Sequence, residues 1–143
     1  MSVNTERLKL AITALESGEY PKGRECLHRI DDGVHSWCCL GVLTIVAVMN
    51  GLEISRELYP EDGYNPQREV FAGHDGEEVL CAEVADFYGL DSNDPELITP
   101  SGDYRRAAAW NDSGPLPDSM APPEEDFTEI AAGFRRTFLE NHE

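Results

Sequence analysis

The sequence predicts a small α+β domain that is mainly helical, and three observations lead to this fold class. Residues 5–17 and the segment after residue 126 repeat apolar side chains at helical spacing. Residues 38–50 are apolar almost throughout, so a helix there must be covered on most sides. Asp-Gly pairs at 32–33 and 75–76 are typical of tight hairpin turns. With 143 residues, 41% of them hydrophobic, the chain is expected to form one domain over 1–143.

Two of the expected helices lie in the N-terminal half. The first is predicted over residues 5–17, where Asn4 or Thr5 can cap its start and Gly18 can end it. The second is the central apolar helix over 38–50, whose length favours a helix over a buried strand. We expect this central helix to form the middle of the core.

Two short hairpins are predicted from their turn residues. The first covers residues 26–37, and strand alternation places Cys26, His28 and Ile30 on one face of its first strand. The second covers residues 68–80, with its tip at the second Asp-Gly pair.

The rest of the chain is expected to alternate short helices with loops. Prolines and a glycine indicate a connector over 53–67. Short helices are predicted over 81–88 and 104–110, and a C-terminal amphipathic helix begins after a cap at Asp126. Loops are expected at 90–102, 111–114 and 115–123, of which the last is proline-rich.

Acidic side chains outnumber basic ones, mostly in the C-terminal two thirds of the chain. There are 28 Asp and Glu against 11 Lys and Arg, a formal net charge of −17. Residues 1–50 contribute −1 of this charge and residues 51–143 contribute −16. Such a surface repels nucleic acid and anionic membranes and attracts basic protein surfaces. General solubility is the alternative explanation of the acidity.

One segment holds carboxylates without any basic residue. Between Arg68 and Arg105 the sequence has no Lys or Arg. We expect its ten carboxylates to contact a partner: Glu69, Asp75, Glu77, Glu78, Glu83, Asp86, Asp91, Asp94, Glu96 and Asp103.

The N-terminus enters a charged amphipathic segment without an apolar leader. The longest apolar stretch, residues 37–49, is too short to span a bilayer. We therefore expect a cytoplasmic protein whose four cysteines are reduced thiols.

Four sequence segments carry a resemblance that covers most of the chain. They are ALESGEY at residues 14–20, CCLGVL at 38–43, AAWNDSG at 108–114 and FTEIA at 127–131. Together they resemble a group of small proteins encoded by bacteriophages, prophages and their bacterial hosts. That group shows A-L-x-S-G-x-Y ahead of C-C-L-G-V-L, and later L-N-D-x-G ahead of F-x-x-I-A.

The resemblance implies a phage accessory protein, of the sort used in host takeover or counter-defence, without implying an established activity. This chain departs from the pattern at Trp110, where the group tends to have Leu, and in the proline-rich segment 115–123.

Two constellations suggest chemistry near the first hairpin. Cys26, His28, His35 and Cys38 have the spacing C-x-H-x6-H-x2-C, and Zn²⁺ accepts two Cys and two His ligands. Cys38 and Cys39 also lie near a predicted helix start, which can activate a thiol with His35 as its base. The alternative for both is that these cysteines are buried as small apolar side chains.

The leading hypothesis is a non-enzymatic protein that binds a basic host protein through its acidic surface, with carboxylates mimicking the phosphates of a nucleic acid. It requires no cofactor. The alternative is a small-ligand-binding protein or enzyme, for example one for nucleotides. Its site would lie by the first hairpin and be lined by Tyr20, Arg24, His28 and His35.

Overall fold

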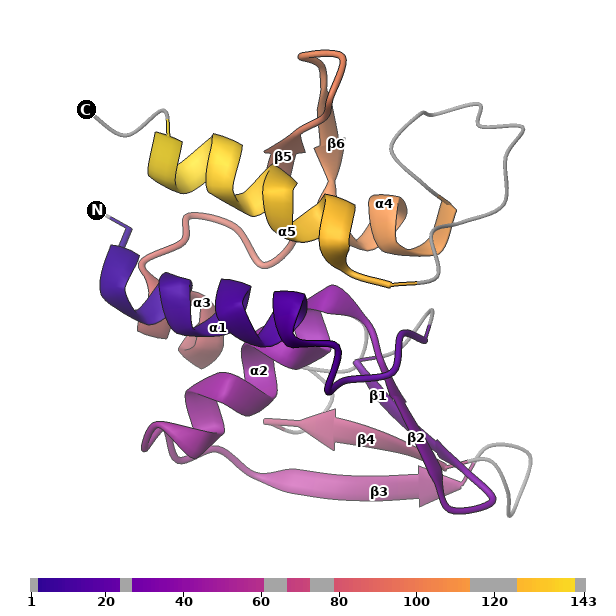
Figure 1. The fold of residues 1–143 in the computed structure, drawn as a ribbon. Coiled ribbons are helices and arrows are strands. Elements are labelled where there is room, and N and C mark those ends of the chain that lie inside the picture. Colours follow the sequence, from indigo (N-terminus) through magenta and orange to yellow (C-terminus); the bar gives the residue numbers. More distant parts are fainter. Residues whose placement is uncertain (1–2, 24–26, 61–66, 73–78, 114–125, 141–143) are drawn as a thin grey trace.

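The fold combines a four-stranded antiparallel sheet, a separate two-stranded hairpin and helices that pack on them (Figure 1). The computed structural model describes residues 3–23, 27–60, 67–72, 79–113 and 126–140. In chain order the elements are α1 (Thr5–Ser17), β1 (His28–Asp31), β2 (Val34–Trp37), α2 (Cys39–Met49), β3 (Arg56–Pro60), β4 (Gln67–Phe71), α3 (Ala82–Tyr88), β5 (Glu96–Ile98), β6 (Tyr104–Arg106), α4 (Ala107–Ser113), α5 (Thr128–Phe134) and a π-helical end, η2 (Arg135–Glu140).

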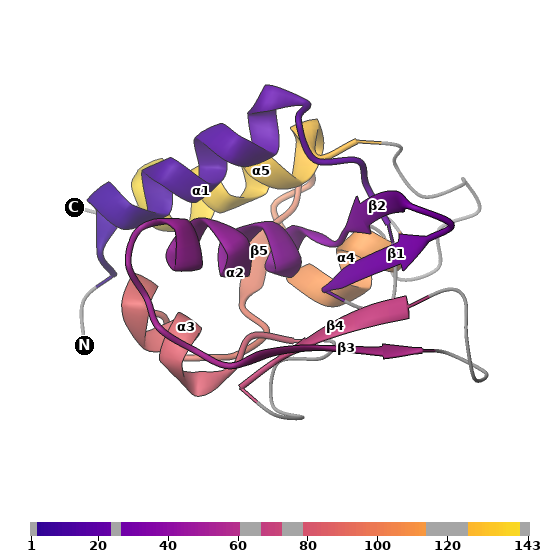
Figure 2. The same ribbon diagram turned by 90° about the horizontal axis from the view of Figure 1, so that it is seen from below.

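Helix α1 forms as predicted. The side chain of Asn4 accepts a hydrogen bond from the backbone N–H of Arg7 at 3.1 Å, and the helix ends at Gly18. Its predicted apolar stripe is buried: Leu8, Ala11, Ile12 and Leu15. Helix α5 runs beside α1, and both lie on the same side of α2 (Figure 2).

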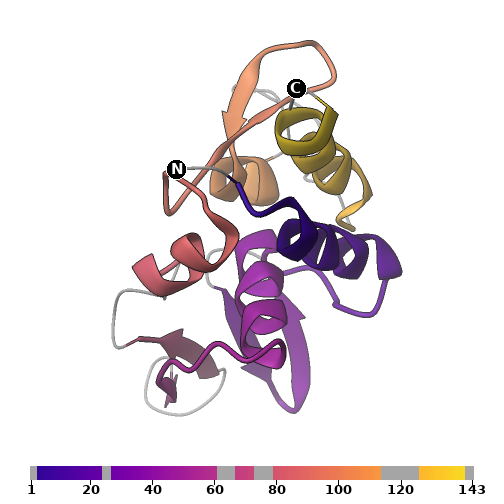
Figure 3. The same ribbon diagram turned by 90° about the vertical axis from the view of Figure 1, so that its left-hand side faces the viewer.

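Helix α2 is the centre of the core, as predicted. All its residues from Cys39 to Ala47 are buried, and the helix lies between α1 and the sheet (Figures 1 and 3). Its start packs directly on the chain ahead of the first hairpin. A Cβ on Gly41 would lie 1.9 Å from the carbonyl oxygen of Leu27, so only glycine fits there.

The first hairpin also forms as predicted. β1 pairs with β2, and the turn residues Asp32 and Gly33 have φ of 54° and 81°. Positive φ at both central residues matches the right-handed twist of the two strands. Cys26 lies outside the described residues.

The connector predicted over 53–67 is wrong in part, because β3 lies within it. β3 pairs with β4, and the sheet order β2-β1-β4-β3 makes β3 an edge strand. Pro60 sits at the end of this edge strand, where a missing N–H is tolerated. Proline therefore did not exclude a strand here.

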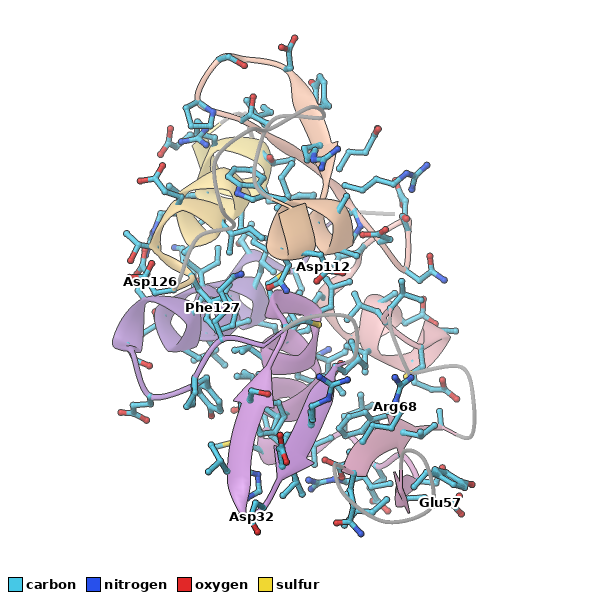
Figure 4. The ribbon with its side chains drawn as sticks, turned by 90° about the vertical axis from the view of Figure 1, so that its right-hand side faces the viewer. Asp32, Glu57, Arg68, Asp112, Asp126 and Phe127 are labelled. Atoms are coloured by element: carbon cyan, nitrogen blue, oxygen red, sulfur yellow. The ribbon has the colours of Figure 1, made fainter. Side chains whose placement is uncertain are left out.

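The second predicted hairpin, over 68–80, is wrong in its pairing. β4 pairs with β3 and β1, whereas residues 79–80 are not in a strand. The predicted tip at 75–76 lies outside the described residues. Figure 4 shows Arg68 of β4 and Glu57 of the neighbouring strand β3, which the pairing of these strands brings to the same part of the sheet.

The segment from 90 to 113 differs from its prediction. Part of the expected loop over 90–102 is β5, and the first three residues of the expected helix over 104–110 form β6. α4 starts at Ala107 and includes Asn111, so the turn predicted at 111–114 is wrong for its described residues. Strand pairing between β5 and β6 overrode the helical reading of residues 104–106.

The two remaining helices form as predicted. α3 ends at Gly89, and α5 begins after Asp126, whose carboxylate accepts the backbone N–H of Thr128 at 3.0 Å. α5 packs on α4 where a Cβ on Gly133 would lie 2.8 Å from the ring of Trp110. The proline-rich segment 115–123 lies outside the described residues.

These elements make a single small α+β domain, as predicted. The expectation that it is mainly helical is not clearly supported, because the sheet and the β5–β6 hairpin make up a substantial part of the structure.

Candidate functional site

The first hairpin brings two histidines together. His28 of β1 lies opposite Trp37 of β2, and their rings stack with centroids 3.6 Å apart. His35 lies on the same face of β2, with its Nδ1 2.7 Å from Nε2 of His28. His28 is 4% exposed, whereas His35 is exposed. The pair therefore connects a buried ring with solvent.

The buried histidine also contacts a carboxylate on the next strand. The pairing of β1 with β4 sets Glu69 opposite His28, with Oε1 of Glu69 2.6 Å from Nδ1 of His28. Arg56 of β3 donates to the same carboxylate, from Nε at 2.5 Å and from Nη2 at 3.3 Å. Because the strand order is β2-β1-β4-β3, these contacts cross the whole sheet. We call His35, His28, Glu69 and Arg56 the cross-sheet chain.

Glu69 stays ionised although its side chain is only 7% exposed. Burial by itself raises the pKa of this carboxyl, but the hydrogen bonds from His28 and Arg56 outweigh it and hold the pKa below its ordinary value. The side chain of Arg56 is 41% exposed, so one end of the ion pair reaches solvent. The carboxylate therefore acts as a fixed negative charge behind His28.

Of the four residues predicted to line a ligand site, His28 and His35 contact each other through their ring nitrogens. The third, Tyr20, packs edge-on against Trp37 at a centroid distance of 5.6 Å. Arg24 lies outside the described residues.

Sequence reasoning missed Glu69 and Arg56 as members of this site. Glu69 was assigned to the partner-binding surface, which is wrong, because it is 5% exposed and paired with His28 and Arg56. The available signal was its position two residues before the apolar Phe71, which puts both on the core face of one strand.

The described members of the predicted metal site, His28, His35 and Cys38, do not converge as ligands, and Cys26 lies outside the described residues. Both ring nitrogens of His28 are taken, one by Glu69 and one by His35. Cys38 instead caps α2, with its Sγ accepting the backbone N–H of Gly41 at 3.3 Å. Within the described ranges, no group of three or more His, Cys, Asp or Glu could hold a metal ion.

The predicted thiol chemistry has no support in the geometry. Cys38 and Cys39 are both buried in the core around α2. Burial raises the pKa of the Cys39 thiol far above its ordinary value, and burial likewise raises that of Cys81. A protonated, buried thiol is a poor nucleophile.

The predicted partner-binding carboxylates have different surroundings. Asp94 accepts the backbone N–H of Ala108 at 3.0 Å and so supports the start of α4. Glu96 lies opposite Arg106 in the β5–β6 pairing, and Asp103 accepts from the hydroxyl of Ser101 at 3.3 Å. Three others lie outside the described residues: Asp75, Glu77 and Glu78.

The remaining three, Glu83, Asp86 and Asp91, lie exposed on α3 and just after it. A hollow of about 500 Å³ lies on one side of α3 and is lined by Glu83, Asp86 and Phe87, among others. A second, of about 360 Å³, is lined by Asp86, Asp91 and Ser92, among others. We call Glu83, Asp86 and Asp91 the α3 ridge, in which Asp86 lines both hollows.

Exposed carboxylates also occur on other elements of the described structure. They lie on α1, in the loop after it, at the tip of the first hairpin and on β3: Glu6, Glu19, Asp31, Asp32 and Glu57. Figure 4 shows Asp32 at the hairpin tip, far along the sheet from α4. Negative charge is thus not confined to residues 69–103.

The residues that carry the sequence resemblance hold the fold together. Asn111 is fully buried, and its Oδ1 accepts the backbone N–H of Cys39 at the start of α2 at 3.0 Å. Its Nδ2 donates to the carbonyl of Gly23 at 2.9 Å and to Asp112 at 3.1 Å. Asn111 thus ties α4 to α2 and to the segment before the first hairpin.

The chain belongs to the family described as "Domain of unknown function (DUF8296)", whose model matches residues 4–131. No curated protein and no solved structure matches this chain. In the ranges that the structure describes, every helix is too short or too polar to cross a membrane.

Proposed function

We propose that this chain is an interaction protein that binds a basic protein surface through the α3 ridge. The observation that carries the proposal is the position of Asp86 between two hollows, with Glu83 on one side and Asp91 on the other. Lysine or arginine side chains of a partner could enter both hollows and pair with these carboxylates. The proposal thus assigns partner binding to three of the ten predicted carboxylates, Glu83, Asp86 and Asp91.

One cation of the chain itself lies in the larger hollow. Arg7 of α1 lines the larger hollow, but it donates from Nη1 to the carbonyl oxygen of Phe87 at 3.0 Å. Its guanidinium also lies over the ring of Phe87, 4.2 Å from the centroid. A guanidinium of the chain itself thus lies against the ring of Phe87, in the hollow that Glu83 and Asp86 also line.

The resemblance to phage and prophage proteins supports a role in host takeover or counter-defence. In that setting the partner is a basic, nucleic-acid-binding host protein in the cytoplasm of the host cell. The carboxylates then take the place of nucleic acid phosphates, so binding must weaken as salt increases.

The test compares two triple variants that lose the same charge. The ridge variant is E83Q/D86N/D91N, and the control is E19Q/D31N/D32N, whose three carboxylates are exposed elsewhere. The probe is a fluorescent oligo-arginine peptide, titrated at low and at physiological salt and followed by anisotropy. At about 0.2–1 kcal/mol per exposed ion pair, the loss of three pairs should weaken binding by the ridge variant about threefold to 160-fold.

The control variant should change the affinity by less than about twofold at the same salt concentration. Equal losses in the two variants would show that only net charge matters, and the proposal would fail. Binding that does not respond to salt would exclude the phosphate-mimicry mechanism.

A further inference from the structure

With both histidines neutral, the hydrogen bonds of the cross-sheet chain determine where its protons lie. Glu69 is ionised and can only accept, so Nδ1 of His28 donates to it. In a neutral His28 the other nitrogen, Nε2, is then an acceptor, and Nδ1 of His35 donates to it. Nε2 of a neutral His35 is therefore the unprotonated nitrogen, and it belongs to an exposed side chain.

We propose that Nε2 of His35 is a nucleophilic site for small molecules that carry an activated acyl group. The Nε2 lone pair attacks the acyl carbon, the bond from that carbon to the leaving group breaks, and the leaving group departs with the electron pair. The ring of His35 is then cationic until it loses the Nδ1 proton. His28 accepts this proton at Nε2, 2.7 Å away, and the acylated ring of His35 becomes neutral.

The rest of the cross-sheet chain favours this proton transfer. His28 becomes an imidazolium, and its Nδ1–H already points at the carboxylate of Glu69, 2.6 Å away. Low exposure strengthens that charge pair, since His28 is 4% and Glu69 5% exposed. The His28 ring stacks on the ring of Trp37, with centroids 3.6 Å apart, and this contact fixes the orientation of the imidazole. The hydrogen bond from Arg56 fixes the carboxylate of Glu69.

Water then completes the cycle by attacking the acyl carbon of the neutral acyl-imidazole. The bond between that carbon and Nε2 breaks, the carboxylic acid leaves with one proton of the water, and the other water proton passes to solvent. Nδ1 of His35 recovers its proton from Nε2 of His28, so the cross-sheet chain returns to its starting state. This site lies on the first hairpin, whereas the α3 ridge lies on a helix and the loop after it. The His35 proposal is therefore independent of the partner-binding proposal.

Diethyl pyrocarbonate is the probe, because it transfers an ethoxycarbonyl group to histidine. The rate at His35 is measured by peptide mass spectrometry in the full-length chain and compared with N-acetylhistidine amide. Three variants are compared with the wild type. His35→Gln removes the site, and Glu69→Gln keeps a hydrogen-bond acceptor while removing its charge. Glu57→Gln removes an exposed charge from β3 as the matched control.

We expect His35 to react faster than the free amide and about tenfold faster than in Glu69→Gln, which is less than the roughly 10²-fold or more of full general-base catalysis because His28 remains in the variant. Glu57→Gln should react like the wild type. A rate in folded Glu69→Gln within about twofold of wild type would overturn the proposal. If that variant does not fold, ¹⁵N spectra of the wild type decide: the proposal requires a proton on Nδ1 of His35, and a neutral ring protonated on Nε2 would refute it.

Discussion

Asn111→Ala tests whether the Asn-Asp motif holds the fold together. The substitution removes the acceptor for the N–H of Cys39 and the donor to the carbonyl of Gly23. Cys39 is fully buried, so its N–H would have no access to water, at a cost of about 1–3 kcal/mol. With the second lost bond, we expect the free energy of unfolding to fall by about 2–4 kcal/mol.

Urea denaturation and thermal melting measure this loss. In a chain of 143 residues, about 1 kcal/mol shifts Tm by about 3 °C, so Tm should fall by about 6–12 °C. Asn93→Ala is the control, because the side chain of Asn93 is exposed, and its stability should stay within about 0.5 kcal/mol of wild type. Equal stability of the two variants would refute the structural role of Asn111.

Three further predictions concern the core and the cross-sheet chain. Gly41→Ala would place a Cβ 1.9 Å from the carbonyl oxygen of Leu27, so we expect a loss of about 3 kcal/mol or more in urea denaturation. If the free energy of unfolding fell by less than about 1 kcal/mol, the start of α2 and the segment at Leu27 could move apart at little cost, contrary to this prediction. The pKa of Glu69 is lowered in the folded state, so its stabilisation is complete above the ordinary carboxyl pKa and is lost as pH falls through the lowered value. In Glu69→Gln, the free energy of unfolding should therefore decrease less as the pH is lowered than it does in the wild type. An unchanged pH dependence would contradict the ion pair of Glu69 with Arg56. In Cys26→Ser, a thiol reagent should label the folded chain far more slowly than the unfolded chain, since the remaining cysteines are buried: Cys38, Cys39 and Cys81. Rapid labelling of the folded chain would contradict their burial.

The elements that the sequence predicted well are those with local signals. The apolar stripe of α1 lies within the helix that it predicts, and the Asp32-Gly33 pair forms the turn that it predicts. Neither signal depends on residues far away in the sequence. The central helix was predictable because its apolar length exceeds that of an ordinary strand.

The elements that the sequence missed depend on partners elsewhere in the chain. β3 has the sequence RELYP, in which polar and apolar residues do not alternate, and Pro60 and its neighbouring breakers indicated a connector. β5 and β6 are three residues each, too short for a period to be visible. Only their pairing distinguishes them from a loop and from the first turn of a helix.

The candidate sites show the same division. The sequence indicated His28 and His35 as candidates by the first hairpin, but that they meet on one face follows from the register of β1 with β2. The role of Glu69 depends on the pairing of β4 with β1, across 41 residues of sequence, and the charge pattern instead suggested a surface residue. The α3 ridge was present in the predicted set, but its hollows follow from packing that the sequence does not show.

Chemical-shift mapping tests most directly whether the α3 ridge binds cationic protein segments. The ¹⁵N-labelled chain is titrated with the oligo-arginine peptide at physiological salt. We predict saturable shifts concentrated at Glu83, Asp86, Asp91 and the residues lining the two hollows, and weak shifts at Glu19 and Asp32. Shifts spread evenly over all exposed carboxylates would contradict a localised site.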